Sequence, residues 1–128
     1  MKEKLSIISS FIVGSVSYFV GGFDMLISVF CTVIILDTLT GMLKAWNLGE
    51  YESSKFRKGF TKSIAYFLGV VLAVQIDMVL GTSALRDAVL AFFIFNEAVS
   101  IVENLGALGV SFPTSFTDAI KSLHKDKE

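Results

Sequence analysis

Acidic and amide side chains recur along one face of a long apolar segment near residue 97. Glu97 has Asn96 beside it, and Ser100, Glu103 and Asn104 follow at steps of three and four residues. An ionised side chain at mid-membrane costs about 2.5–3.5 kcal/mol on insertion scales. We expect no Lys or Arg at the depth of Glu97, so its carboxyl group must be protonated, hydrogen-bonded or reached by water. Two interpretations follow, a polar seam that holds a sealed bundle or a stripe that faces neighbouring subunits and lines a pore.

Three further acids lie within or beside apolar segments, namely Asp24, Asp37 and Asp77. Asp24 and Asp77 fall near segment ends, which favours solvated boundary residues. Asp37 lies deeper, and either Lys44 or Lys62 is close enough along the chain to pair with it. A structural ion pair and a role in a pore are both open for Asp37.

The sequence offers little that could catalyse a reaction. Cys31 is its only cysteine and His124 its only histidine, which excludes an intrachain disulfide, a cysteine zinc cluster and most hydrolase triads. No nucleophile–base pair or phosphate-cradling loop is present. A net charge of −1 gives no basic footprint for nucleic acid. We therefore expect no enzyme, no metal site, no cofactor and no nucleic-acid partner.

Length and hydropathy indicate a single membrane domain of 128 residues with a mean hydropathy of +0.68. A bilayer core takes about 20 helical residues to cross. The predicted spans are residues 5–22, 24–43, 63–80 and 88–110, with a polar connector at 44–62 and a tail at 111–128. We predict an all-α integral membrane protein whose four transmembrane helices form two hairpins, followed by a short C-terminal amphipathic helix.

Two alternatives qualify this arrangement. The fourth segment is the most polar, and an amphipathic helix in the membrane interface would have a similar pattern. The first segment follows Lys2 and Lys4, and Ser15-Val16-Ser17 resembles a signal-peptide cleavage site. Cleavage there would leave the second span without its hairpin partner, which favours an intact first span.

Basic residues set the orientation, because short loops rich in Lys and Arg stay in the cytoplasm. Ten of the eleven basic residues lie in the N-terminus, the connector and the tail. Four spans place these three regions on one side, with only Arg86 opposite. We therefore expect both termini to be cytoplasmic.

Small residues recur at helical spacing in two spans, as expected for close helix packing in lipid. In the first span they include Ser10, Gly14 and Ser17, and in the third Gly69 and Ala73. Gly41 lies one turn after Asp37 and opens space for a neighbouring backbone. Packing within one molecule and self-association into a homo-oligomer both fit this pattern.

The connector carries four basic residues that could meet a membrane surface. They are Lys55, Arg57, Lys58 and Lys62. Each basic residue near an anionic surface contributes about 1 kcal/mol of attraction. We favour a topology anchor over a specific site for anionic lipids.

Several of these segments resemble the bacteriophage holin family that includes toxin-secretion proteins. The resemblance rests on Gly21-Gly22-Phe23-Asp24, on Asp37 through Gly41, on Ser53-Ser54-Lys55 with Arg57-Lys58-Gly59, and on Asn96 through Asn104. Gly109 and Pro113 follow at the expected positions. The likeness covers roughly residues 20 to 123, and Thr38 departs from it where the family often has an aromatic residue.

The resemblance implies a function that the residue pattern alone does not. Holins accumulate in the bacterial cytoplasmic membrane and open lesions at a set time. The passenger is a phage endolysin or a toxin. Some holins have an inhibitory form from a nearby second start, but the next methionine here is Met25, so we expect any antiholin to be a separate protein. The alternatives are a small ion or proton channel and a non-conducting membrane adaptor.

Overall fold

The structure is a computed structural model that describes residues 1–50 and 52–125. It contains five helices: α1 (Lys2–Val20), α2 (Met25–Leu48), α3 (Ser53–Leu80), α4 (Ala84–Ala107) and α5 (Thr114–Lys125). In the described part of the chain, α1 to α4 are each long and apolar enough to cross a membrane. The predicted all-α fold with four spans and a short C-terminal helix is confirmed.

Local sequence explains where the helices begin and end. Asp24 caps α2 by accepting a hydrogen bond from the Ile27 amide at 3.1 Å. Gly21 ends α1 with φ of 80°, a left-handed conformation that glycine adopts without strain. The α5 helix starts directly after Pro113, whose carbonyl accepts from Phe116 and Thr117.

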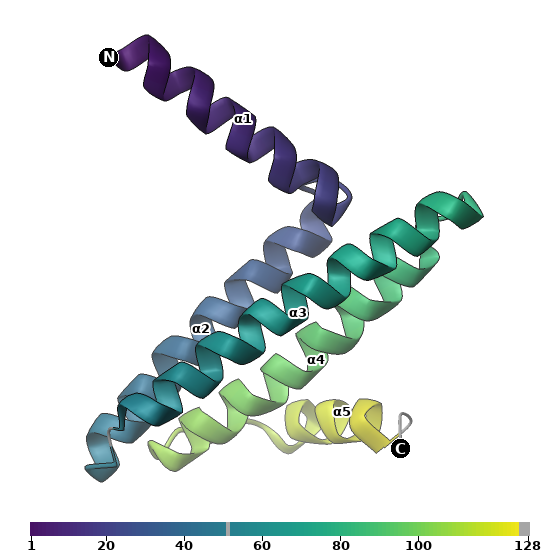
Figure 1. The fold of residues 1–128 in the computed structure, drawn as a ribbon. Coiled ribbons are helices and arrows are strands. Elements are labelled where there is room, and N and C mark those ends of the chain that lie inside the picture. Colours follow the sequence, from purple (N-terminus) through teal and green to yellow (C-terminus); the bar gives the residue numbers. More distant parts are fainter. Residues whose placement is uncertain (51, 126–128) are drawn as a thin grey trace.

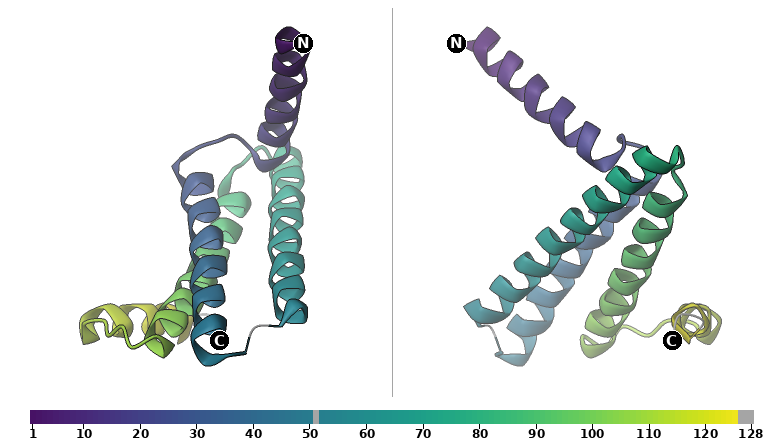
Figure 2. Two further views of the ribbon diagram at one scale, coloured as in Figure 1. Left: turned by 90° about the vertical axis from the view of Figure 1, so that its left-hand side faces the viewer. Right: turned by 45° about the vertical axis from the view of Figure 1, so that its right-hand side comes forward.

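Helices α2, α3 and α4 run alongside one another and form a three-helix bundle (Figure 1). α3 and α4 make the second of the two predicted hairpins. α1 meets α2 at residues 21–24 but then turns away from the bundle instead of packing along it (Figure 2). Only Val20 of α1 is buried, because that end alone reaches the core.

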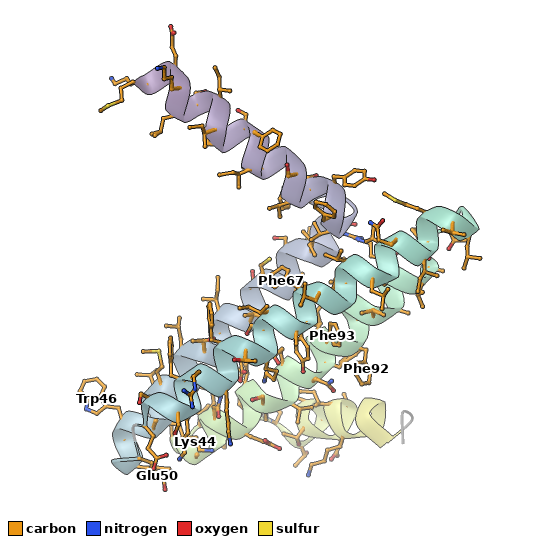
Figure 3. All side chains as sticks on the ribbon, in the orientation of Figure 1. Lys44, Trp46, Glu50, Phe67, Phe92 and Phe93 are labelled. Carbon is orange, nitrogen blue, oxygen red and sulfur yellow. The ribbon has the colours of Figure 1, made fainter. Side chains whose placement is uncertain are left out.

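The apolar core lies in the half of the bundle away from the 49–52 connection. It consists of Val20, Ile27, Phe30, Val70, Val74 and Leu90. Aromatic rings continue it toward the middle, where Tyr66 stacks on Phe93 with ring centres 4.1 Å apart. Phe67 packs edge-on against Phe30 at 5.1 Å, and Figure 3 shows Phe67 and Phe93 at this level of the bundle.

Helix lengths differ from the sequence-based boundaries. The segment 44–62 is mostly helical, because α2 continues to Leu48 and α3 begins at Ser53. Gly49 at φ 67° provides the break, and the neighbouring lysines favour helix. The helix predicted at 88–110 covers Ala84–Ala107. Residues 126–128 of the predicted tail lie outside the described residues.

Candidate functional site

Three charged side chains meet where helices α2, α3 and α4 adjoin, and the Lys62 side chain among them is 42% exposed. Lys62 Nζ of α3 lies 3.0 Å from Glu97 Oε1 of α4 and 3.4 Å from Asp37 Oδ2 of α2. The 3.0 Å contact lacks hydrogen-bond geometry, so Glu97 Oε1 has an ion-pair partner but no hydrogen-bond donor in the described chain. Glu97 is 1% exposed. Two carboxyl groups thus share one ammonium group.

This charged cluster corrects the expectation that no cation lies at the depth of Glu97. Lys62 occupies that depth because α3 starts ten residues earlier than the predicted span. Its side chain then reaches inward between α2 and α4. The same contact confirms Lys62 as a partner of Asp37, one of the two lysines considered from the sequence.

Neutral polar groups extend the cluster between α2 and α4. Ser100 Oγ donates to Asp37 Oδ1 at 2.6 Å, and Asn104 Nδ2 donates to the same oxygen at 3.2 Å. Asn104 also donates to Thr40 Oγ1 at 3.1 Å, a residue that sequence reasoning missed. Glu103 is exposed and Asn96 half-buried, and neither takes part in these bonds. Within one chain, Glu97, Ser100 and Asn104 therefore form a polar seam.

A second charged cluster, at the opposite end of the bundle, is organised by Arg86. Its guanidinium donates to Val20 O at 2.7 Å, to Gly22 O at 3.1 Å and to both carboxylate oxygens of Asp24 at 2.8 and 3.0 Å. It also bonds Asp87 at 3.1 Å. Arg86 thereby ties the α1–α2 corner to the start of α4. Sequence reasoning noted it only as the one basic residue on that side.

The Arg86 cluster changes the interpretation of two acids. Asp77 is buried, not a solvated boundary residue, and accepts from Arg86 N at 2.7 Å, Leu85 N at 3.2 Å and Thr82 Oγ1 at 2.7 Å. It satisfies free amides at the start of α4. Asp24 keeps a half-exposed side chain. The hydrogen bond from the Arg86 guanidinium lowers the pKa of Asp24 to about 2, against the opposing effect of desolvation.

A groove of about 640 Å³ separates α2 from α3 in the half nearer the 49–52 connection. Its walls are largely apolar and include Ile34, Phe60 and Phe67. Asp37, Ser100 and Asn104 also line it, so the polar seam borders the groove. Lys44, Glu50, Glu52 and Lys55 line its end near the connection, where Figure 3 shows Lys44 and Glu50.

Comparison with known proteins decides the family. The sequence profile described as the bacteriophage holin family matches residues 14–125. This chain belongs to the bacteriophage holin family. A probable holin of Bacillus phage phi105 is 32% identical over 98% of this chain and 88% of its own length.

Other relatives carry no assigned function. The uncharacterized protein YqxH of Bacillus subtilis is 34% identical over 98% of this chain and 85% of its own length. An uncharacterized 14.9 kDa protein of Clostridium perfringens is 35% identical over 84% of this chain and 83% of its own length. No solved structure matches the chain. The family and the four apolar helices together make this holin a multi-pass membrane protein, and family membership indicates a non-enzymatic role.

The small residues of this holin divide into two groups. A Cβ atom on Gly69 would lie 3.2 Å from Phe93 Cζ, and Ala73 is buried, so both serve packing within the chain. A Cβ atom on Gly41 would lie 3.7 Å from Asn104 Nδ2, which is an ordinary van der Waals distance. On α1, none of the residues that the structure describes outside this helix lies within 4 Å of the Cβ position of Gly14. Ser10 and Gly14 line a shallow hollow of about 440 Å³, and Ser17 is half-buried near the corner.

The basic residues of the holin's connector region also have different environments. Lys55 pairs with Glu50 at 3.7 Å, and both side chains are exposed. Arg57 and Lys58 are exposed on the first turns of α3, where a membrane surface can reach them. Lys62 belongs to the charged cluster instead of the surface group. Among the described residues, no group of three or more His, Cys, Asp or Glu side chains could hold a metal ion.

Proposed function

We propose that this holin self-associates in the bacterial cytoplasmic membrane and opens lesions through which a phage endolysin reaches the cell wall. The observation that carries the proposal is the charged cluster of Asp37, Lys62 and Glu97 near the middle of helices that are apolar enough to cross a membrane. Ionisable residues at such depth are costly and mark paths for water or ions. Family membership and the probable phage holin relative support the same role.

The geometry suggests how a sealed state precedes the lesion. Within one chain, Glu97, Ser100 and Asn104 of α4 face α2 and α3, so these three side chains hold the bundle together and do not face lipid. Lining a lesion requires these helices to separate and water to replace the contacts of Glu97 and Asp37. The seam and the pore lining are then the same residues in two states.

The proposed orientation places both termini in the cytoplasm. The 49–52 connection and the junction between α4 and α5 lie at the same end of the bundle (Figure 1). That end carries Lys55, Arg57 and Lys58, and such residues favour the cytoplasmic side. We propose that these three side chains act as a topology anchor at the membrane surface, without a specific site for anionic lipids.

Release of cytosolic contents after induced expression in bacteria tests the function. A small dye and a folded reporter enzyme are followed together with the membrane potential. The proposal predicts loss of both dye and enzyme after a lag, in one sudden step. Loss of dye with the enzyme retained would point to a small channel instead, a role that two acids beside one lysine also fit. An intact potential at high membrane levels of protein would favour an adaptor.

The passenger is tested separately by supplying each candidate in the same cells. An endolysin that lacks its own export signal should lyse cells only when the holin is co-expressed. A holin dedicated to toxin secretion would release the toxin while leaving cell walls intact. A separately encoded antiholin, if present, would lengthen the lag when co-expressed.

A further inference from the structure

Two apolar surfaces have no packing partner among the described residues of this chain, namely the groove between α2 and α3 and most side chains of helix α1. The groove has largely apolar walls inside helices that cross the membrane, so water alone does not fill it favourably. α1 buries only Val20 and leaves Leu5, Phe11 and Ile12 more than half exposed. We propose that α1 docks into the groove between α2 and α3 of its own chain and closes a four-helix bundle.

The position of α1 favours its own groove. In the left view of Figure 2, α2 and α3 stand side by side with α4 behind them. Helix α1 rises from the upper end of the bundle, opposite the connection between α2 and α3. The connection to α2 spans only residues 21–24, a length that normally makes consecutive helices antiparallel neighbours. Gly21 and Gly22 have φ of 80° and 103°, and glycines there can change direction without side-chain strain.

The register of such a hairpin brings small residues together. Val20 and Ile27 already share the core, which sets Ser10 at the depth of Asp37 and Ser6 at the depth of Gly41. Asp37 contacts Lys62, so Ser63 and Gly59 of α3 lie at these same two depths. Ser63 and Gly59 line the groove, and Gly59 has nothing within 4 Å of its Cβ position. Small residues on both helices allow close backbone approach in lipid.

Charge also fits this occupant. The N-terminal turn of α1 carries Lys2 and Lys4, which the register places at the end of the groove near the 49–52 connection. Glu50 and Glu52 line that end. Lys44 and Lys55 line the same end, and Lys55 pairs with Glu50, so this end is polar and balanced in charge. An antiparallel α1 therefore keeps Lys2 and Lys4 at a polar end of the groove, whereas the opposite direction would place the lysines against the apolar core.

Docked α1 would cover Asp37, Ser100 and Asn104 where they border the groove. This arrangement goes beyond lesion formation and does not depend on it. Disulfide crosslinking in membranes before any lysis tests it, because two cysteines join only when their Cα atoms come within about 7 Å. The test variant carries Ser10→Cys and Ser63→Cys in a Cys31→Ser background.

A matched variant with Ser10→Cys and Ala65→Cys controls for random collision. Ala65 lies two residues from Ser63, is exposed, and does not line the groove. Under mild oxidation, docking predicts at least tenfold more intrachain disulfide in the Ser63 variant than in the Ala65 variant, measured by intact mass on monomeric protein. Adding Gly59→Leu should lower that yield at least fivefold, while Gly106→Leu, outside the groove, should leave it unchanged.

Three results would overturn the proposal. Disulfides between differently tagged chains, without the intrachain product, would place α1 in the groove of a second copy. Equal yields in the Ser63 and Ala65 variants would mean that α1 has no fixed site. Absence of both products in chains that accumulate normally would leave the groove to lipid. Release of a reporter enzyme is measured separately, so failure of docking and failure of lesion formation are distinguishable.

Discussion

At the scale of single residues, the two charged clusters have different characters. Arg86 has all its donor groups directed at carbonyl and carboxylate oxygens, which makes it a fixed structural clamp. In the other cluster, Lys62 pairs with two acids, and a buried oxygen of Glu97 has no hydrogen-bond donor within residues 1–50 and 52–125. A buried carboxyl oxygen without a hydrogen-bond donor is stabilised when water reaches it. The cluster around Glu97 is therefore the better candidate for a site that opens.

Substitution Lys62→Met should destabilise the holin, because it leaves two facing carboxylates without their cation. Loss of one partner from a fully buried pair costs about 3–5 kcal/mol, and the partly exposed Lys62 reduces this to about 1–3 kcal/mol. Thermal unfolding in detergent measures the loss. Adding Glu97→Gln should recover part of it, and strictly additive losses would show that the two residues are not coupled.

Arg86→Lys should also destabilise, on the order of 2 kcal/mol, although the charge is kept. A lysine ammonium cannot reproduce the fork that holds both oxygens of Asp24 together with the carbonyls of Val20 and Gly22. The same unfolding assay applies, with exposed Arg57→Lys as the matched control. Equal melting temperatures for the two variants would argue against the clamp.

The Arg86 cluster should also make stability depend on pH in the acid range. The pKa of Asp24 is lowered to about 2 in the folded protein, against about 3.9 for an unperturbed aspartate. The unfolded chain therefore takes up the proton first, so the stabilisation is complete above about pH 4 and is lost as pH falls toward 2. For a half-exposed carboxylate we expect about 1 kcal/mol.

Unfolding of the wild type and Asp24→Asn between pH 7 and pH 2.5 isolates this contribution. The difference in stability between the two proteins should shrink as the pH drops below 4. A difference that stays constant over the whole range would contradict the assigned pairing with Arg86.

At the scale of helices, apolar length and turn residues predicted most of the architecture. The four spans follow from hydropathy and the C-terminal helix from its amphipathic pattern after Pro113, and Gly21, Gly49 and Gly81 mark the ends of three helices. The helical structure within residues 44–62 was missed because this segment is polar, and hydropathy identifies apolar spans but not polar extensions of the same helices. The partners of Glu97 and Asp77 were missed because Lys62 and Arg86 come from other helices, and pairing across helices leaves no periodic signal.

The α3–α4 contact should be sensitive to side-chain size at Gly69. Gly69→Leu would press on Phe93, which already lies 3.2 Å from the Cβ position. Overpacking of this kind costs about 1–3 kcal/mol. Thermal unfolding should show the loss, whereas Gly106→Leu, with nothing within 4 Å of its Cβ position, should leave stability unchanged or raised. Equal effects at both glycines would contradict the packing described.

At the scale of the whole molecule, the two halves of the three-helix bundle differ. One half is filled by the aromatic and apolar core, and the other half contains the groove between α2 and α3. The core of Phe30, Val70 and Leu90 seals the bundle toward the Arg86 cluster, while the polar seam borders the groove. A lesion large enough for a folded enzyme needs many copies, since three packed helices enclose no such passage. The proposed assembly would use the apolar side chains that α2 to α4 leave exposed.

The timing of lysis in Glu97→Gln tests the central claim, that the charged cluster inside the bundle controls opening. Glu103→Gln is the matched control, because it removes the same charge from an exposed position on the same helix. Enzyme release and membrane potential are recorded after induction at equal membrane levels of both variants. We predict that Glu97→Gln shifts the onset of release at least twofold in time while Glu103→Gln keeps the wild-type onset. Wild-type timing in both variants would contradict a role for the Asp37–Lys62–Glu97 cluster in opening.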